Sequence, residues 1–175
     1  MEKKETIKSV TFILSGMMLQ MFNGIGSGWA STLTAIFGII LLFMGLTKLK
    51  QGLDEAGKSA VKLIIIAIVI GVVGLILSLI PLMGLVIAPI IFIVAFIVEL
   101  IGIIKLKKSD TIGDVGKSGV TLLLVAMILA ILDSIFSFIP LAGGIIGAIL
   151  SLVALILVFF GWIRVQDGII SDKSE

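Results

Sequence analysis

Long uncharged runs of apolar residues dominate the pattern of the chain. No charged residue occurs from Ser9 to Thr47, and none occurs from Leu63 to Val98. The second run has 36 residues, about 54 Å as a helix at 1.5 Å per residue. A hydrocarbon core of about 30 Å takes about 20 residues, so each run is expected to cross a bilayer twice. The crossings are expected to be helical, because a helix satisfies its own backbone polar groups in lipid.

Turn-forming residues divide these runs into pairs of spans. Pro81 and Pro140 each interrupt an apolar run, and the glycine-rich stretch 23–28 interrupts the first, followed by Trp29 as an interfacial anchor. The pattern predicts an all-α integral membrane bundle of six transmembrane helices in three helical hairpins. The later spans are predicted at Val61–Ile80, Leu82–Ile104, Val120–Ile139 and Leu141–Ile163.

The three hairpins resemble copies of one unit. Each opens with a Lys-Ser signature and closes with a glycine followed three residues later by a basic residue, and the last two units align without gaps at an offset of 59. Such a repeat indicates one supersecondary unit packed against its neighbours. Parallel copies argue against the inverted repeats of many transporters. The chain, 1–175, is predicted to be one transmembrane domain with repeats at about 8–50, 58–107 and 117–166.

The basic residues predict the orientation. All 13 fall before the first span, in the two long loops or after the last span, and the three hairpin tips have none. The positive-inside rule then places both termini and both long loops in the cytoplasm, with the protein in the inner membrane. The serines of the Lys-Ser signatures, Ser9, Ser59 and Ser118, are interpreted as helix N-caps rather than as docking residues. The acidic Glu2 and Glu5 argue against a cleaved signal peptide.

Composition excludes several kinds of chemistry. Hydrophobic residues make up 59% of the chain and charged residues 14%, the mean hydropathy is +1.34, and cysteine, histidine and tyrosine are absent. Thiol chemistry, disulfides and imidazole catalysis are therefore excluded. The net charge of +2 is too small for a nucleic-acid footprint. Without a paired carboxylate or a soluble domain, we expect no enzyme and no cofactor.

One stretch matches a nucleotide-binding pattern. Gly52 to Ser59 fits G-x-x-x-x-G-K-[ST], the loop that holds phosphates between a strand and a helix. Here predicted transmembrane spans precede and follow it, and the equivalent loop has Thr111 in place of the first glycine. We therefore interpret the match as a hairpin entrance.

Asp133 is the main candidate site within the spans. It lies seven residues before Pro140, about 10 Å along the helix, which places it near the level of Ser151. One interpretation is a protonated aspartate whose hydrogen bonds to serines hold helices together. The alternative is a carboxylate that binds a proton or a cation. The candidate polar site comprises Asp133, Ser134, Ser137, Ser151 and Gln20.

A second acid and a set of small residues suggest structural roles. Glu99 is six residues before Lys105 and is expected to approach the level of Lys62, which predicts an ion pair near the cytoplasmic boundary. Gly143, Gly147 and Ser151 recur every four residues, so they share one helix face that suits close helix packing.

The hairpin turns and exits carry a family resemblance. The turns read LIPLMG and FIPLAGG, and the exits read GIIKL and GWIRV. In these features the chain resembles small prokaryotic three-hairpin membrane proteins, including the acid-resistance membrane protein family. The resemblance covers all six spans and implies a small inner-membrane protein linked to stress, with no known chemistry and no functional residue to transfer.

The sequence favours a non-enzymatic protein that acts through helix packing. It would be an accessory subunit or scaffold of a membrane assembly, or a homo-oligomer, with the lipid bilayer and a membrane protein as partners and no nucleic acid. The alternative is a small proton or cation channel or transporter that uses Asp133. Lipid binding between hairpins is a third class of function, for which the sequence offers no residue signature.

Overall fold

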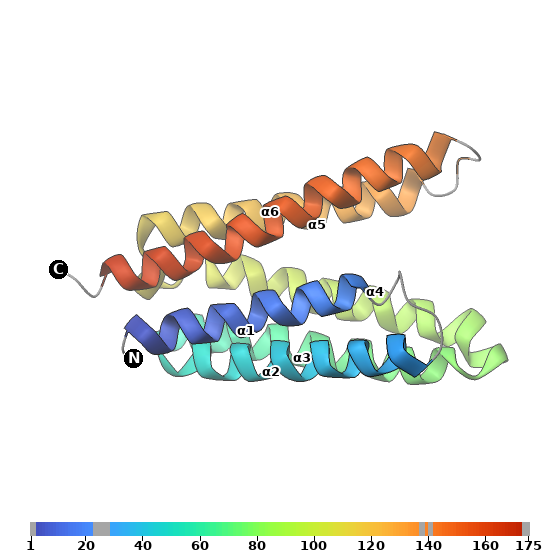
Figure 1. Cartoon of the computed structure of the whole chain (residues 1–175), viewed down its shortest axis with the longest axis horizontal. Helices are drawn as coiled ribbons and strands as arrows, with labels where there is room; N and C mark the ends of the chain where they lie inside the picture. The colour runs from blue at the N-terminus through green and yellow to red at the C-terminus, as the bar shows by residue number, and fades with distance from the viewer. Residues whose placement is uncertain (1–2, 23–28, 137–138, 140–141, 173–175) are drawn as a thin grey trace. The chain divides into compact units, whose positions relative to one another are not determined.

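The computed structural model describes residues 3–22, 29–136, 139 and 142–172. All regular secondary structure in that part of the chain is helical, which confirms the predicted all-α fold. Figure 1 shows the helices in chain order. They are α1 (Lys3–Phe22), α2 (Trp29–Gln51), α3 (Glu55–Ser78), α4 (Pro81–Leu106), the 3₁₀ helix η1 (Asp110–Ile112), α5 (Gly113–Phe136) and α6 (Ala142–Asp172).

Five of these helices, α2 to α6, are long and apolar enough to cross a membrane. The chain is therefore a multi-pass membrane protein. Six spans were predicted, but among the described residues α1 is not long and apolar enough to count as a span. Its first two turns hold Lys3, Lys4, Glu5 and Lys8, and the uncharged remainder, 9–22, is about 21 Å long. This length is shorter than the thickness of a hydrocarbon core, which is about 30 Å.

The chain forms two compact units, Met1–Ser109 and Asp110–Glu175. In the first unit α1 packs against α2, α2 against α3, and α3 against α4. In the second unit α5 packs against α6, and η1 contacts both helices. Consecutive helices thus form the hairpins α1–α2, α3–α4 and α5–α6 (Figure 1).

The later hairpins begin their helices upstream of the apolar spans. Asp54 is the N-cap of α3, and its carboxylate accepts a hydrogen bond from the Gly57 backbone nitrogen at 2.9 Å. Gly113 begins α5 with φ of +55°, a conformation that residues with a Cβ rarely adopt. The nucleotide-binding pattern, Gly52 to Ser59, runs from the end of helix α2 into the start of helix α3. The loop that holds phosphates follows a strand, so the structure lacks the element that should precede it in the described part of the chain.

The entrance serines do not cap helices, so that prediction was wrong. Ser59 and Ser118 lie in the second turn of α3 and α5, and Ser9 lies inside α1. The Ser9 and Ser118 hydroxyls donate to carbonyl oxygens of their own helices, at 2.7 Å in both cases. The polar residues that precede each apolar span continue the helix, and Asp54 supplies the α3 cap further upstream. Hydropathy alone does not mark such a boundary.

Glycines let the two helices approach closely at one end of every hairpin. In each hairpin a glycine of the second helix faces a backbone carbonyl of the first, at the end that holds the lysines and arginine, which we call the basic end. The distance from a Cβ built on the glycine to that oxygen shows how little space is available. It is 2.6 Å from Gly45 to Ser9, 3.1 Å from Gly102 to Ala60, and 3.0 Å from Gly161 to Gly119.

Burial also differs between the two ends of a hairpin, as α3–α4 shows. Apolar side chains beside these glycines are buried, including Val10, Val61, Val120, Leu46, Ile103 and Trp162. The opposite end, where the chain turns back, we call the turn end. There Leu79, Leu82 and Leu85 are 79%, 77% and 78% exposed. Apolar side chains that face lipid lose nothing by exposure, so the turn end of α3–α4 presents apolar surface to lipid or to other helices.

Candidate functional site

The structure brings Asp133 of α5 into contact with α6. The Ser151 hydroxyl donates a hydrogen bond to Asp133 Oδ2 at 2.8 Å. Gly147 lies one turn before Ser151, and a Cβ built there would be 2.5 Å from Asp133 Oδ1. The missing side chain of Gly147 therefore makes room for the carboxylate. Asp133, Gly147 and Ser151 form what we call the α5–α6 polar contact.

Two other predicted members of the polar site, Ser134 and Gln20, make contacts with backbone carbonyls. The Ser134 hydroxyl donates to the Ala130 carbonyl of its own helix at 3.0 Å. Gln20 belongs to the first unit, where its amide donates to the Ala35 carbonyl at 3.2 Å. Ser137 lies outside the described residues. Gly143 is the second residue of α6, and its surroundings also lie outside the description.

Equivalent positions of α3–α4 make the same contact with different residues. The offset of 59 aligns Asp133 with Gly74 and Ser151 with Phe92. A Cβ built on Gly74 would be 3.1 Å from the Phe92 ring. Ala88, the equivalent of Gly147, is buried. One hairpin thus fills this position with an aromatic ring over a glycine, and the other fills it with a carboxylate over a glycine.

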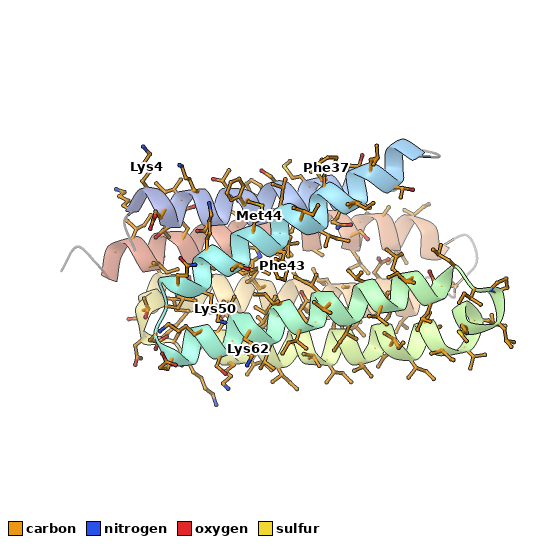
Figure 2. All side chains as sticks on the ribbon, turned by 90° about the horizontal axis from the view of Figure 1, so that it is seen from below. Lys4, Phe37, Phe43, Met44, Lys50 and Lys62 are labelled. Carbon is orange, nitrogen blue, oxygen red and sulfur yellow. The ribbon has the colours of Figure 1, made fainter. Side chains whose placement is uncertain are left out.

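Glu99 and Lys62 form no ion pair in the described part of the chain, contrary to the prediction. The ion pairs found there join Lys58 to Glu55 and Lys117 to Asp114. Lys62 is on the exposed side of α3, and Figure 2 shows it near the basic end. Gly102 contacts Ile64 and Gly74 contacts Phe92, which places Glu99 more than a turn from Lys62. Sequence spacing gave the approximate level but not the helix face.

Sequence reasoning missed the polar contacts at the basic ends. Lys105 Nζ donates to Ser59 Oγ at 2.7 Å, and Arg164 Nη1 donates to Ser118 Oγ at 3.2 Å. Both pairs join the serine of a hairpin entrance to the basic residue of its exit. The two repeated signatures could have revealed this pairing, because a residue at the start of a hairpin lies beside one at its end.

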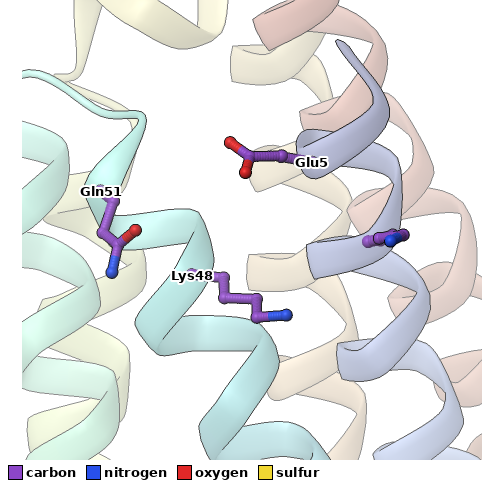
Figure 3. Close-up of a pocket in the computed structure, with 4 residues that line it drawn as sticks. Glu5, Lys48 and Gln51 are labelled. Atoms are coloured by element: carbon purple, nitrogen blue, oxygen red, sulfur yellow. The ribbon is translucent and has the colours of Figure 1, made fainter. Parts of the chain in front are cut away.

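A polar pocket of about 210 Å³ lies at the basic end of α1–α2. Figure 3 shows Glu5 on α1 and Lys48 on α2 extending toward the space between the two helices, with Gln51 nearby. Lys8 completes the lining. Lys48 Nζ lies 5.0 Å from the centroid of the Phe12 ring, within reach of a cation–π attraction. The sequence pattern did not predict this pocket.

Comparison with known proteins adds no family or fold relative. No protein-family model, no curated protein and no solved structure matches the chain. Among the described residues there is no group of three or more acidic side chains that could hold a metal ion.

Proposed function

We propose that this multi-pass protein is not an enzyme and acts through helix packing, as an accessory subunit or scaffold of a membrane assembly or as a homo-oligomer. The exposed turn ends are the main support. Leu82, Leu85 and Ile145 are 77%, 78% and 69% exposed, whereas Leu46, Ile103 and Trp162 near the basic ends are buried. Without a hydrophobic driving force in lipid, such faces associate through close packing. The partners are lipid and other membrane helices.

The charge pattern supports an inner-membrane location with both termini in the cytoplasm. The labelled lysines Lys4, Lys50 and Lys62 lie toward one end of the first unit, and Phe37 lies further toward the turn end (Figure 2). The two hairpins of this unit therefore have their basic residues at the same end. Basic residues face the cytoplasm by the positive-inside rule.

Gly144 offers the sharpest test of packing between proteins. It is exposed on α6, and a Cβ built there would have no atom within 4 Å. Gly144→Leu should therefore leave the hairpin intact and obstruct a close helix–helix approach. Val153→Leu is the matched control, because Val153 is exposed nine residues further along, on the opposite side of the helix at 100° per residue.

The measurement is the mass of the protein extracted from its membranes in mild detergent. We expect the unmodified chain and Val153→Leu to exceed the 18.5 kDa of one chain, and Gly144→Leu to show a smaller assembly. An unchanged assembly in Gly144→Leu would exclude this face as the interface. An unmodified chain that runs alone would reject the proposal.

The second candidate function is proton or cation binding at Asp133. Its support is the polar contact itself, because α3–α4 fills the equivalent position with Gly74 and Phe92 and needs no carboxylate there. Intramembrane carboxylates commonly serve ion pathways. The test is ion flux into liposomes that contain the protein. Flux that Asp133→Asn removes would support this function, and flux equal to that of empty liposomes would reject it.

A further inference from the structure

The basic ends of the last two hairpins share one hydrogen bond. Lys105 and Ser59 in α3–α4 correspond to Arg164 and Ser118 in α5–α6, at the repeat offset of 59. In each pair the exit residue donates to the entrance hydroxyl. The exit cation therefore has an oxygen acceptor within its own hairpin.

The hairpin α1–α2 has a lysine where the others have that serine. Gly45 contacts the Ser9 carbonyl and Ile13, as Gly102 contacts the Ala60 carbonyl and Ile64. This register aligns Ser9 with Ala60, so Lys8 occupies the position of Ser59. The exit residue Lys48 occupies the position of Lys105. Two cations thus stand where the other hairpins have a cation and its acceptor.

The pocket between them has no matching anion in the described part of the chain. Lys8 and Lys48 line it with Glu5 and Gln51. Within the described residues, neither lysine comes within ion-pair distance of a carboxylate, Glu5 included. Neighbouring like charges repel, so a bound anion would stabilise this arrangement. Two lysines and one glutamate give the lining a formal charge of +1.

We propose that this pocket binds the headgroup of an anionic glycerophospholipid, with the phosphodiester held between Lys8 and Lys48. One phosphodiester charge balances the +1 of the lining, and Glu5 and Gln51 accept hydrogen bonds from headgroup hydroxyls. This proposal is independent of the packing function.

The location favours a lipid over a soluble phosphate ester. The pocket lies at the end of α2, at the headgroup level expected for a lysine cluster. Phe43 and Met44 precede Lys48 on α2 by one to two turns, in the direction of the turn end. Their side chains are 43% and 42% exposed. This apolar surface suits the acyl chains of the same lipid (Figure 2).

Lys8→Ser tests the site and should preserve the fold, because it recreates the serine–lysine pair of the other hairpins. Lys62→Ser is the matched control, since it removes the same charge from an exposed position outside the pocket. Binding of phosphatidylglycerol to the full chain in detergent is measured by native mass spectrometry. Phosphatidylcholine with the same acyl chains and soluble glycerol phosphate are compared.

We expect the unmodified chain to bind phosphatidylglycerol about tenfold more tightly than phosphatidylcholine. A lost charge-assisted hydrogen bond corresponds to about a tenfold loss of affinity for Lys8→Ser. Lys62→Ser should lose much less, and Lys8→Arg should retain binding. Equal binding by the two serine variants, equal binding of the two lipids, or loss in Lys8→Arg would overturn the proposal. Glycerol phosphate that competes at the lipid's own concentration would assign the site to a soluble ester and overturn it too.

Discussion

The hairpins α3–α4 and α5–α6 place different side chains at the same helix–helix contact. In α3–α4 the Phe92 ring packs over Gly74, with Ala88 buried one turn away. In α5–α6 the Asp133 carboxylate lies over Gly147 and accepts a hydrogen bond from Ser151. The apolar set shows that this position does not require a charge. Either set fills the space between two helices, so the polar contact can act as packing.

The two hairpins are alike at their basic ends. Gly102 and Gly161 both face a backbone carbonyl of the preceding helix, and Ile103 and Trp162 beside them are buried. Lys105 and Arg164 both donate to an entrance serine. The two hairpins therefore share their close contacts at the basic end, and their residues differ nearer the turn end.

The largest expected effect is at the shared basic-end glycines. Gly102→Leu and Gly161→Leu should each lower the free energy of unfolding by about 3 kcal/mol, because the added side chain meets buried backbone. Gly71→Leu is the control, since a Cβ at Gly71 has no atom within 4 Å. Unfolding by denaturant in detergent micelles measures the difference. A cost for Gly71→Leu equal to the others would contradict this account of the basic end.

A smaller effect on the free energy of unfolding is expected at Gly147, where α5–α6 differs from α3–α4. Gly147→Ala would push the Asp133 carboxylate away from Ser151, at a cost of about 1 kcal/mol. Adding Asp133→Gly gives α5 a glycine at the position that Gly74 occupies in α3. The alanine introduced by Gly147→Ala should then fit as Ala88 does in α4. A double-mutant cycle on the free energy of unfolding should then show coupling. Additive effects would mean that Gly147 and Asp133 do not pack together.

The smallest expected effects concern the hydrogen bond alone. Ser151→Ala should lower the free energy of unfolding by about 0.6 kcal/mol, a typical value for a hydrogen bond between membrane helices. Asp133→Asn should change it less, because the amide still accepts from Ser151. The same unfolding measurement tests both. A loss of several kcal/mol in Asp133→Asn would show that the carboxylate has a structural role that Gly74 and Phe92 do not reproduce.

The sequence predicted the helices and hairpins because uncharged runs and prolines mark them directly. It also placed Asp133 and Ser151 at one level, because the short loop between α5 and α6 leaves little freedom in register. It did not predict which faces meet. The spans are apolar all round, so hydropathy does not distinguish the exposed side of α3, where Lys62 lies, from its buried side. The pairing of Lys8 with Lys48 likewise depends on the contact of Gly45 with Ser9.

The most direct test of the packing account transfers one hairpin's residues to the other. The triple variant Asp133→Gly, Gly147→Ala, Ser151→Phe gives α5–α6 the contact residues of α3–α4. The measurement is the mass of its assembly after extraction from membranes in mild detergent, next to the unmodified chain. We predict the same assembly, larger than the 18.5 kDa of one chain. A triple variant that keeps its helical content but runs as a lone chain would contradict the account.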